Sequence, residues 1–96
     1  MDISKGDLVV SLAGRDKDNI FYVVNVEENF VFLADGKTRK LENPKRKKLK
    51  HVRFVSRIDS RVADKLRTGD KVLNSELRRD LAVNGQYLTV RTKEDE

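Results

Sequence analysis

The sequence of 96 residues contains no cysteine and only one histidine, His51. Without cysteine, the chain can form no disulfide, no thiolate metal site, no iron–sulfur cluster and no cysteine nucleophile. A single histidine excludes multi-histidine metal sites and leaves one side chain that titrates near neutral pH as a base. We therefore predict that the protein is not an enzyme, and we expect no catalytic residue, no bound metal and no cofactor.

Long apolar stretches are missing as well. No run of residues reaches the length of a membrane span or of the hydrophobic part of a secretory signal. We therefore expect a cytoplasmic protein that starts at Met1 and has no membrane partner. Hydrophobic residues make up 38% of the chain, which is enough for one compact core but not for a deep cavity. A small-molecule substrate is accordingly not expected.

The positive charge is concentrated in one segment. Residues 37–57 hold ten basic residues and one acidic residue, for a net charge of +9, whereas residues 1–36 carry −4 and residues 58–96 are neutral. Like charges in close contact repel by roughly 1 kcal/mol per pair in water, so folding alone does not favour such a segment. A solvated loop that aids solubility is one interpretation. Clustered Lys and Arg also bind phosphates through counterion release, and the imbalance favours this second interpretation. The candidate contacts in the segment are Lys37, Arg39, Lys40, Lys45, Arg46, Lys47, Lys48, Lys50, His51 and Arg53.

Apolar alternation and β-branched residues predict a mostly β fold. Turn residues separate the predicted strands, which lie at residues 8–13, 20–26, 30–34 and 49–55. In the first strand, Leu8, Val10 and Leu12 fall on one face. Residues between the third and fourth strands read as a basic loop. Four short strands with tight turns, and a second strand that is apolar on both faces, favour a small closed barrel.

Helical patterns replace strand patterns in the last third of the chain. Val62, Ala63 and Leu66 predict a helix at residues 60–68. A second helix is predicted near residues 74–84, with Leu73, Leu77 and Leu81 on one side and an end at Asn84-Gly85. The predicted organisation is a barrel at residues 1–56, a C-terminal extension packed on it at residues 57–92, and a frayed tail at residues 93–96.

Most of the six aromatic residues lie in predicted strands, which is typical of core positions. For Tyr22, stacking on a nucleic-acid base is an alternative to core packing. His51 is either an ordinary strand histidine or a contact to a phosphate or base.

The N-terminal half resembles a KOW motif. The motif consists of two strands around one glycine, here residues 6–16 with Gly14 and residues 22–26. The segments that follow, residues 28–36 and the basic residues 44–52, extend the likeness. In this order the chain resembles the large-subunit ribosomal protein family numbered fourteen of the eukaryotic and archaeal type, together with its KOW-containing RNA-binding relatives in bacteria. The resemblance covers residues 5–55 and continues weakly into the helix at 74–84.

This resemblance implies an SH3-like barrel that binds ribosomal RNA of the large subunit, with ribosomal proteins as further partners. The loop at Gly14, with Arg15 and Lys17, would form a first contact region. The basic segment from Lys45 to Lys50 would form the second. The alternative is that the barrel is a protein-interaction module of a transcription or translation factor.

For the RNA-binding hypothesis, the sequence predicts recognition mainly of RNA shape and backbone, with little readout of bases. It also predicts that Lys45→Glu, Arg46→Glu and Lys47→Glu together abolish binding while the domain stays folded.

Overall fold

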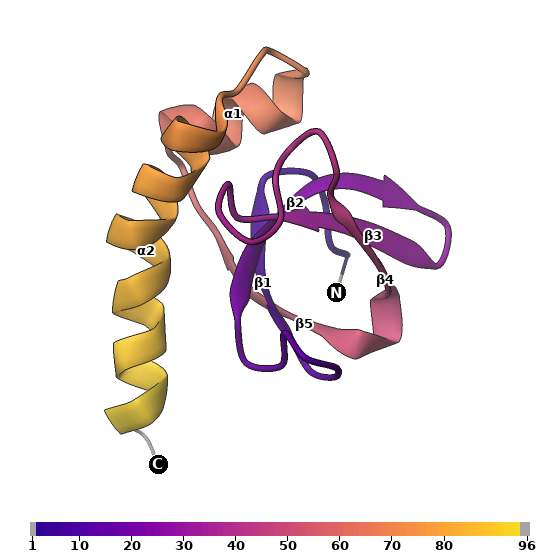
Figure 1. Ribbon diagram of the computed structural model, residues 1–96, viewed down its shortest axis with the longest axis vertical. Coiled ribbons are helices and arrows are strands. Elements are labelled where there is room, and N and C mark those ends of the chain that lie inside the picture. Colours follow the sequence, from indigo (N-terminus) through magenta and orange to yellow (C-terminus); the bar gives the residue numbers. More distant parts are fainter. Residues whose placement is uncertain (1, 95–96) are drawn as a thin grey trace.

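The computed structural model describes the backbone of residues 2–94 and the side chains of residues 2–84. Five antiparallel strands form one sheet in the order β4-β3-β2-β1-β5, and two helices follow the sheet in the chain (Figure 1). The elements are β1 (Asp7–Ser11), β2 (Ile20–Glu27), β3 (Phe30–Ala34), β4 (Lys45–Lys48), the 3-10 turn η1 (Leu49–His51), β5 (Val52–Arg57), α1 (Arg61–Thr68) and α2 (Asn74–Glu94). Neither helix is long and apolar enough to cross a membrane within the described residues.

The mostly β prediction is confirmed, but the predicted closed barrel is not. The sheet is strongly curved (Figure 1), yet β4 and β5 are its two outer strands and pair only with β3 and β1 among the described residues. The sheet therefore remains open along one side.

Apolar residues cover both faces of the sheet. On one face, Leu8 and Tyr22 pack with α1 and α2, and Leu77 of α2 is fully buried there. On the other face, Val9 and Phe21 belong to a second cluster, enclosed by the curvature of the sheet. Every residue of β1 is consequently buried, and its successive residues Leu8 and Val9 belong to the clusters on opposite faces. Leu12 lies beyond the end of β1 and is 43% exposed, so its predicted place in this strand is wrong.

The basic segment contains a strand where a loop was predicted. Lys45–Lys48 form β4, and Lys47 pairs with Val31 of β3. Lysine is not a favoured strand residue, so the pairing comes from the otherwise open edge of β3. The predicted strand at 49–55 is wrong at its start, because residues 49–51 form η1 and β5 begins at Val52.

Both helices lie where the sequence predicts them, with a correction at the C-terminal end of α2. The Oγ atom of Ser60 accepts a hydrogen bond from the backbone N–H of Ala63 and caps α1. Leu73 precedes α2 and is 51% exposed, so it does not contribute to the core face.

The predicted stop of α2 at Asn84-Gly85 is wrong, because the helix continues to Glu94. The Asn84 side chain donates back to Asp80 in the preceding turn, and a glycine inside a helix costs only about 1 kcal/mol. Of the predicted frayed tail at 93–96, residues 95 and 96 lie outside the described residues.

Candidate nucleic-acid interface

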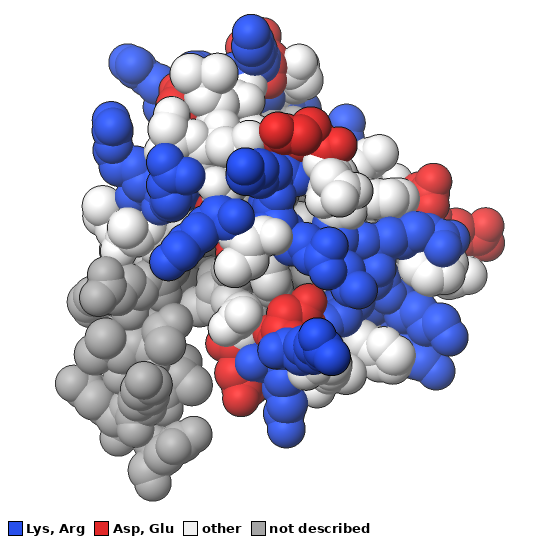
Figure 2. Space-filling view, in the orientation of Figure 1, with Lys and Arg blue, Asp and Glu red and all other residues white. Residues whose placement is uncertain are grey.

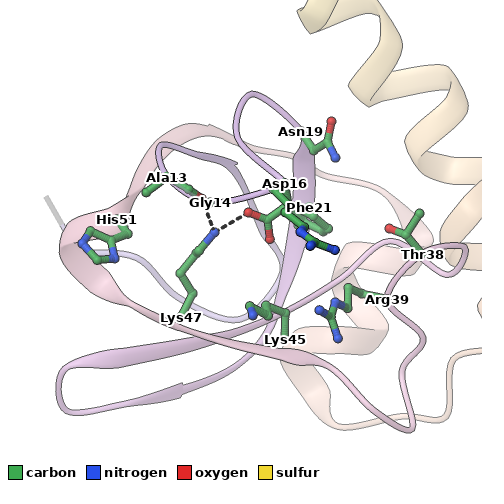
Figure 3. A pocket seen from close by; sticks show the side chains of 11 residues that line it. Ala13, Gly14, Asp16, Asn19, Phe21, Thr38, Arg39, Lys45, Lys47 and His51 are labelled. Atoms are coloured by element: carbon green, nitrogen blue, oxygen red, sulfur yellow. Dashed lines mark hydrogen bonds and ion pairs between the residues drawn. The ribbon is translucent and has the colours of Figure 1, made fainter.

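One open pocket of about 620 Å³ is bordered by both predicted contact regions, the Gly14 loop and the basic segment (Figure 3). Gly14 and Arg15 line it from the loop between β1 and β2. Lys45 lines it from β4, and His51 from η1. The remaining side is formed by the loop between β3 and β4, which contributes Thr38 and Arg39. Both predicted contact regions therefore border the same pocket.

The loop at Gly14 is held in a tight turn by its own backbone. Gly14 has φ = +86°, and its carbonyl oxygen accepts a hydrogen bond from the Lys17 N–H at 3.2 Å. The Asp18 N–H donates to the Ser11 carbonyl at 2.8 Å and closes the turn. A Cβ at Gly14 would meet no atom closer than 3.6 Å, so the positive φ angle, rather than lack of space, requires glycine. The turn leaves Arg15 and Lys17 exposed.

Lys47 has a different role from its neighbours in β4. Its side chain is only 7% exposed, and its ammonium donates to Ser11 Oγ at 2.6 Å, to the Ala13 carbonyl at 2.7 Å and to Asp16 Oδ1. An ammonium has three protons, so these three acceptors use its full capacity. The structure therefore places Lys47 in the scaffold that ties the Gly14 loop to β4, and not among the cations available to a phosphate.

Asp16 is the anionic partner in this scaffold. Burial by itself would raise the pKa of its carboxyl group, but the hydrogen bonds from Lys47 and Ser11, with the Lys47 charge, lower the pKa below its ordinary value. Asp16 therefore stays ionised, and Lys47 cancels its charge. Asp16 therefore repels a phosphate bound at the neighbouring Arg15 less strongly than an unpaired aspartate would.

The Asp35 carboxylate organises the loop on the opposite side of the pocket. It accepts hydrogen bonds from the backbone N–H groups of Lys37 and Arg39, both at 2.9 Å, and from Thr38 Oγ1 at 2.7 Å. Burial would raise the pKa of Asp35, but these hydrogen bonds, from Thr38 first, outweigh it and lower the pKa. The next residue, Gly36, has φ = +78°, and a Cβ there would press on the Asn74 carbonyl oxygen.

These contacts seat the loop on the N-terminal end of α2. Arg78 of α2 donates to the Gly36 carbonyl at 3.0 Å, and the Leu41 N–H donates to Asn74 Oδ1 at 2.8 Å. Arg39 and Thr38 are thus presented to the pocket from a loop that is fixed at both ends.

The remaining predicted contacts are available to a ligand to different degrees. Figure 2 shows basic side chains gathered in a band over the sheet, with fewer acidic side chains between them. Arg39, Lys45 and His51 are half-buried. The exposed candidates are Arg15, Lys17, Lys37, Lys40, Arg46, Lys48, Lys50 and Arg53.

Tyr22 is not available for stacking. It is fully buried, and its hydroxyl donates to Asp80 of α2 and lies 3.4 Å from Ser60 Oγ at the start of α1. Burial, together with the bond to Asp80, raises the pKa of the Tyr22 hydroxyl. Tyr22 therefore anchors both helices to the sheet, as the core-packing alternative requires.

Two polar residues of the pocket, Asn19 and Thr38, were not among the predicted contacts. Neither is charged, and neither belongs to a motif, so nothing local in the sequence distinguishes them. They lie at the pocket only because two loops far apart in the sequence meet there.

Comparison with known proteins finds no match for this chain, either among protein-family models or among curated proteins. The likeness to the KOW motif is thus carried only by the residues quoted for it, and the function has to be inferred from the site.

Proposed function

We propose that the protein is a non-enzymatic RNA-binding module of the KOW type that binds structured RNA of the large ribosomal subunit in the cytoplasm. The observation that carries the proposal is the meeting of the Gly14 loop and the basic segment at one pocket. Two regions of unlike sequence would have no reason to share a cationic pocket if the lysines served only solubility.

The chemistry of the pocket suits a phosphodiester backbone. Arg15, Arg39 and Lys45 provide positive charge on three sides, while Thr38 and Asn19 provide neutral hydrogen-bond donors. The pocket is open, as expected for a surface that follows a polymer. The curved sheet and its enclosed apolar cluster support an SH3-like barrel as the framework for this surface.

The first test is a filter-binding titration with a structured fragment of large-subunit ribosomal RNA over a range of salt concentrations. Neutralising about five phosphates predicts a log–log slope of about −3.5 to −4.5. The variant Arg15→Glu/Arg39→Glu/Lys45→Glu should weaken binding by at least about 100-fold and flatten the slope by about 2 to 3.

A charge-matched control comes from exposed residues of the helical region. The triple variant Arg61→Glu/Lys71→Glu/Arg79→Glu changes the net charge equally but lies away from the pocket. Its affinity should stay much closer to that of the unaltered protein, and circular dichroism should show both variants folded. Equal losses in the two variants would reduce the binding to net charge alone and contradict the proposed site.

Association with the ribosome is tested by sucrose-gradient fractionation of a cell lysate at low and high salt. Migration with the large subunit after a high-salt wash would indicate a stable ribosomal protein. Migration there only at low salt would indicate a loosely bound factor. If the protein stays at the top of the gradient in both, the ribosomal part of the proposal fails.

A protein-interaction module is the second candidate function. It is favoured by the outer strand β5, whose second edge has no strand partner among the described residues. Nuclease treatment separates the two functions, because RNA-mediated association should vanish and direct protein docking should survive.

A further inference from the structure

Arg46 on the outer face of β4 stacks on the aromatic ring of Phe30 in β3. The Cζ atom of Arg46 lies 3.6 Å from the centroid of the Phe30 ring. This separation corresponds to van der Waals contact, which is about 3.5–4.0 Å between carbon atoms, so the guanidinium rests on the ring face. Glu27 of β2 holds the same side chain from a second direction, with its Oε1 atom 3.7 Å from Arg46 Nε.

The strand register explains why these side chains meet. Glu27 pairs with Phe30 across β2 and β3, and Arg46 pairs with Phe32 across β3 and β4. Residues that pair directly across a sheet share a face, and diagonal neighbours are within reach of long side chains. Phe30 is thus flanked by an anion on one strand and by a cation on the next.

Arg46 is held in place and still accessible. Its side chain is 56% exposed despite the contacts with Phe30 and Glu27. A long side chain normally loses considerable rotamer freedom when it binds a ligand. The ring and the carboxylate already restrict Arg46, which lowers that loss.

The two faces of β4 serve different purposes. Successive strand residues point to opposite faces, so Lys45 and Lys47 lie on the side of the pocket, whereas Arg46 and Lys48 lie on the outer side. No further strand pairs with the free edge of β4 among the described residues. A chain of nucleotides can therefore pass over this edge and contact both faces.

A base suits Arg46 better than a phosphate does. Glu27 already balances the charge of Arg46, and its carboxylate would repel a phosphate placed there. Stacking needs only the flat outer side of the guanidinium, and arginine planes accept unpaired bases in this way. Every base has such a face, so stacking would add affinity without reading the sequence.

We infer that Arg46, supported by Phe30, is a stacking platform for one unpaired base of the bound RNA. This inference rests on the proposed RNA-binding function and specifies its ligand: a backbone phosphate occupies the pocket, and a base from an unpaired nucleotide lies on Arg46. The preferred RNA is accordingly a helix interrupted by a bulge or loop, and not a continuous duplex.

The test uses the full chain and two RNA hairpins. One hairpin has a continuous stem, and the other has the same stem with a single bulged 2-aminopurine, whose fluorescence falls when it stacks. The unaltered protein should bind the bulged hairpin about 5- to 150-fold more tightly, the range expected for one stacked base, and should quench its fluorescence.

The decisive variant is Arg46→Lys, which keeps the charge but removes the plane. It should lose most of the preference for the bulge while binding the continuous stem within about two-fold of the unaltered protein. Arg79→Lys is the matched control, because Arg79 is an exposed arginine of α2 that lies away from the pocket and has no cation–π contact among the described residues. It should leave both affinities and the quenching unchanged. Phe30→Leu tests the support of the platform independently and should also reduce the preference.

The outcomes separate this inference from the function on which it rests. If the unaltered protein binds neither hairpin with salt-dependent affinity, the proposed function fails. If it binds both hairpins equally well, or if Arg46→Lys behaves like Arg79→Lys, RNA binding stands and the platform is refuted.

Discussion

Lys47 and Lys48 are adjacent lysines, but substituting them should change the stability of the domain by very different amounts. Lys47 is buried with three acceptors around its ammonium, whereas Lys48 is exposed on the other face of β4. We predict that Lys47→Met lowers the free energy of unfolding severely and that Lys48→Met changes it by less than about 0.5 kcal/mol. Methionine preserves most of the volume of lysine, so the comparison isolates the ammonium.

The magnitude follows from the groups that Lys47→Met leaves behind. Removing one partner of a buried ion pair costs about 3–5 kcal/mol, because the other charge remains uncompensated. Asp16 keeps 17% of its side chain exposed, which places the expected loss near the lower end, at about 3 kcal/mol. For a domain of this size, each kcal/mol shifts the melting temperature by about 4–8 °C, so a decrease of about 12–24 °C is expected.

Urea unfolding followed by circular dichroism measures the difference directly. The double variant Asp16→Asn/Lys47→Met removes both charges and should be more stable than Lys47→Met alone, since no uncompensated carboxylate remains. If Lys47→Met and Lys48→Met unfold at the same urea concentration, the buried network does not stabilise the domain and our reasoning is wrong. The same result would mean that Lys47 is free to bind a phosphate.

The triple variant predicted from the sequence includes Lys47→Glu, which should unfold the domain. That variant therefore cannot be used to measure RNA binding.

Three further predictions concern the scaffold. Tyr22→Phe removes the hydroxyl that donates to Asp80 and should cost about 1.5–3 kcal/mol in urea unfolding; a loss below about 0.5 kcal/mol would contradict its anchoring role. Gly36→Ala should lower the free energy of unfolding by about 2–5 kcal/mol, because a positive φ combines with a clash against α2. Gly69→Ala has φ = +82° but open space around the added Cβ, so it should cost only about 1–2 kcal/mol. Similar melting temperatures for the two variants would refute the clash. The folded-state pKa of Asp16 lies below its ordinary value of 3.8, so its contribution to the free energy of unfolding is present above that value and is lost as pH falls through the folded-state pKa. Unfolding measured at a series of acid pH values should show a smaller loss of stability in Lys47→Met than in the unaltered protein.

Strong local signals made several elements predictable. β2 and β3 follow from dense β-branched and aromatic residues, and β3 has the predicted bounds Phe30–Ala34. α1 is predicted from the helical spacing of Val62, Ala63 and Leu66, and in the structure the cap at Ser60 and the glycine at position 69 fix its two ends. In each case, the residues that determine the element lie within it or beside it.

β4 could not be predicted in this way. Four consecutive basic residues have no apolar period, so their sequence gives no sign of a strand or of its buried face. The edge of β3 imposes the strand, and the register of that pairing buries Lys47 while exposing Arg46. A register shift of one residue would exchange their roles.

The amino-acid sequence by itself determined that this is a small, mostly β protein with a +9 segment, because composition, alternation and caps are local properties of the chain. Only the tertiary structure decided how the charges are used. Pairing across strands and between distant loops sorts chemically identical lysines into one that holds the scaffold together and others that face solvent, and it brings Arg15, Thr38 and Lys45 to a single pocket. These relations are set by contacts between residues far apart in the chain, which no local pattern records.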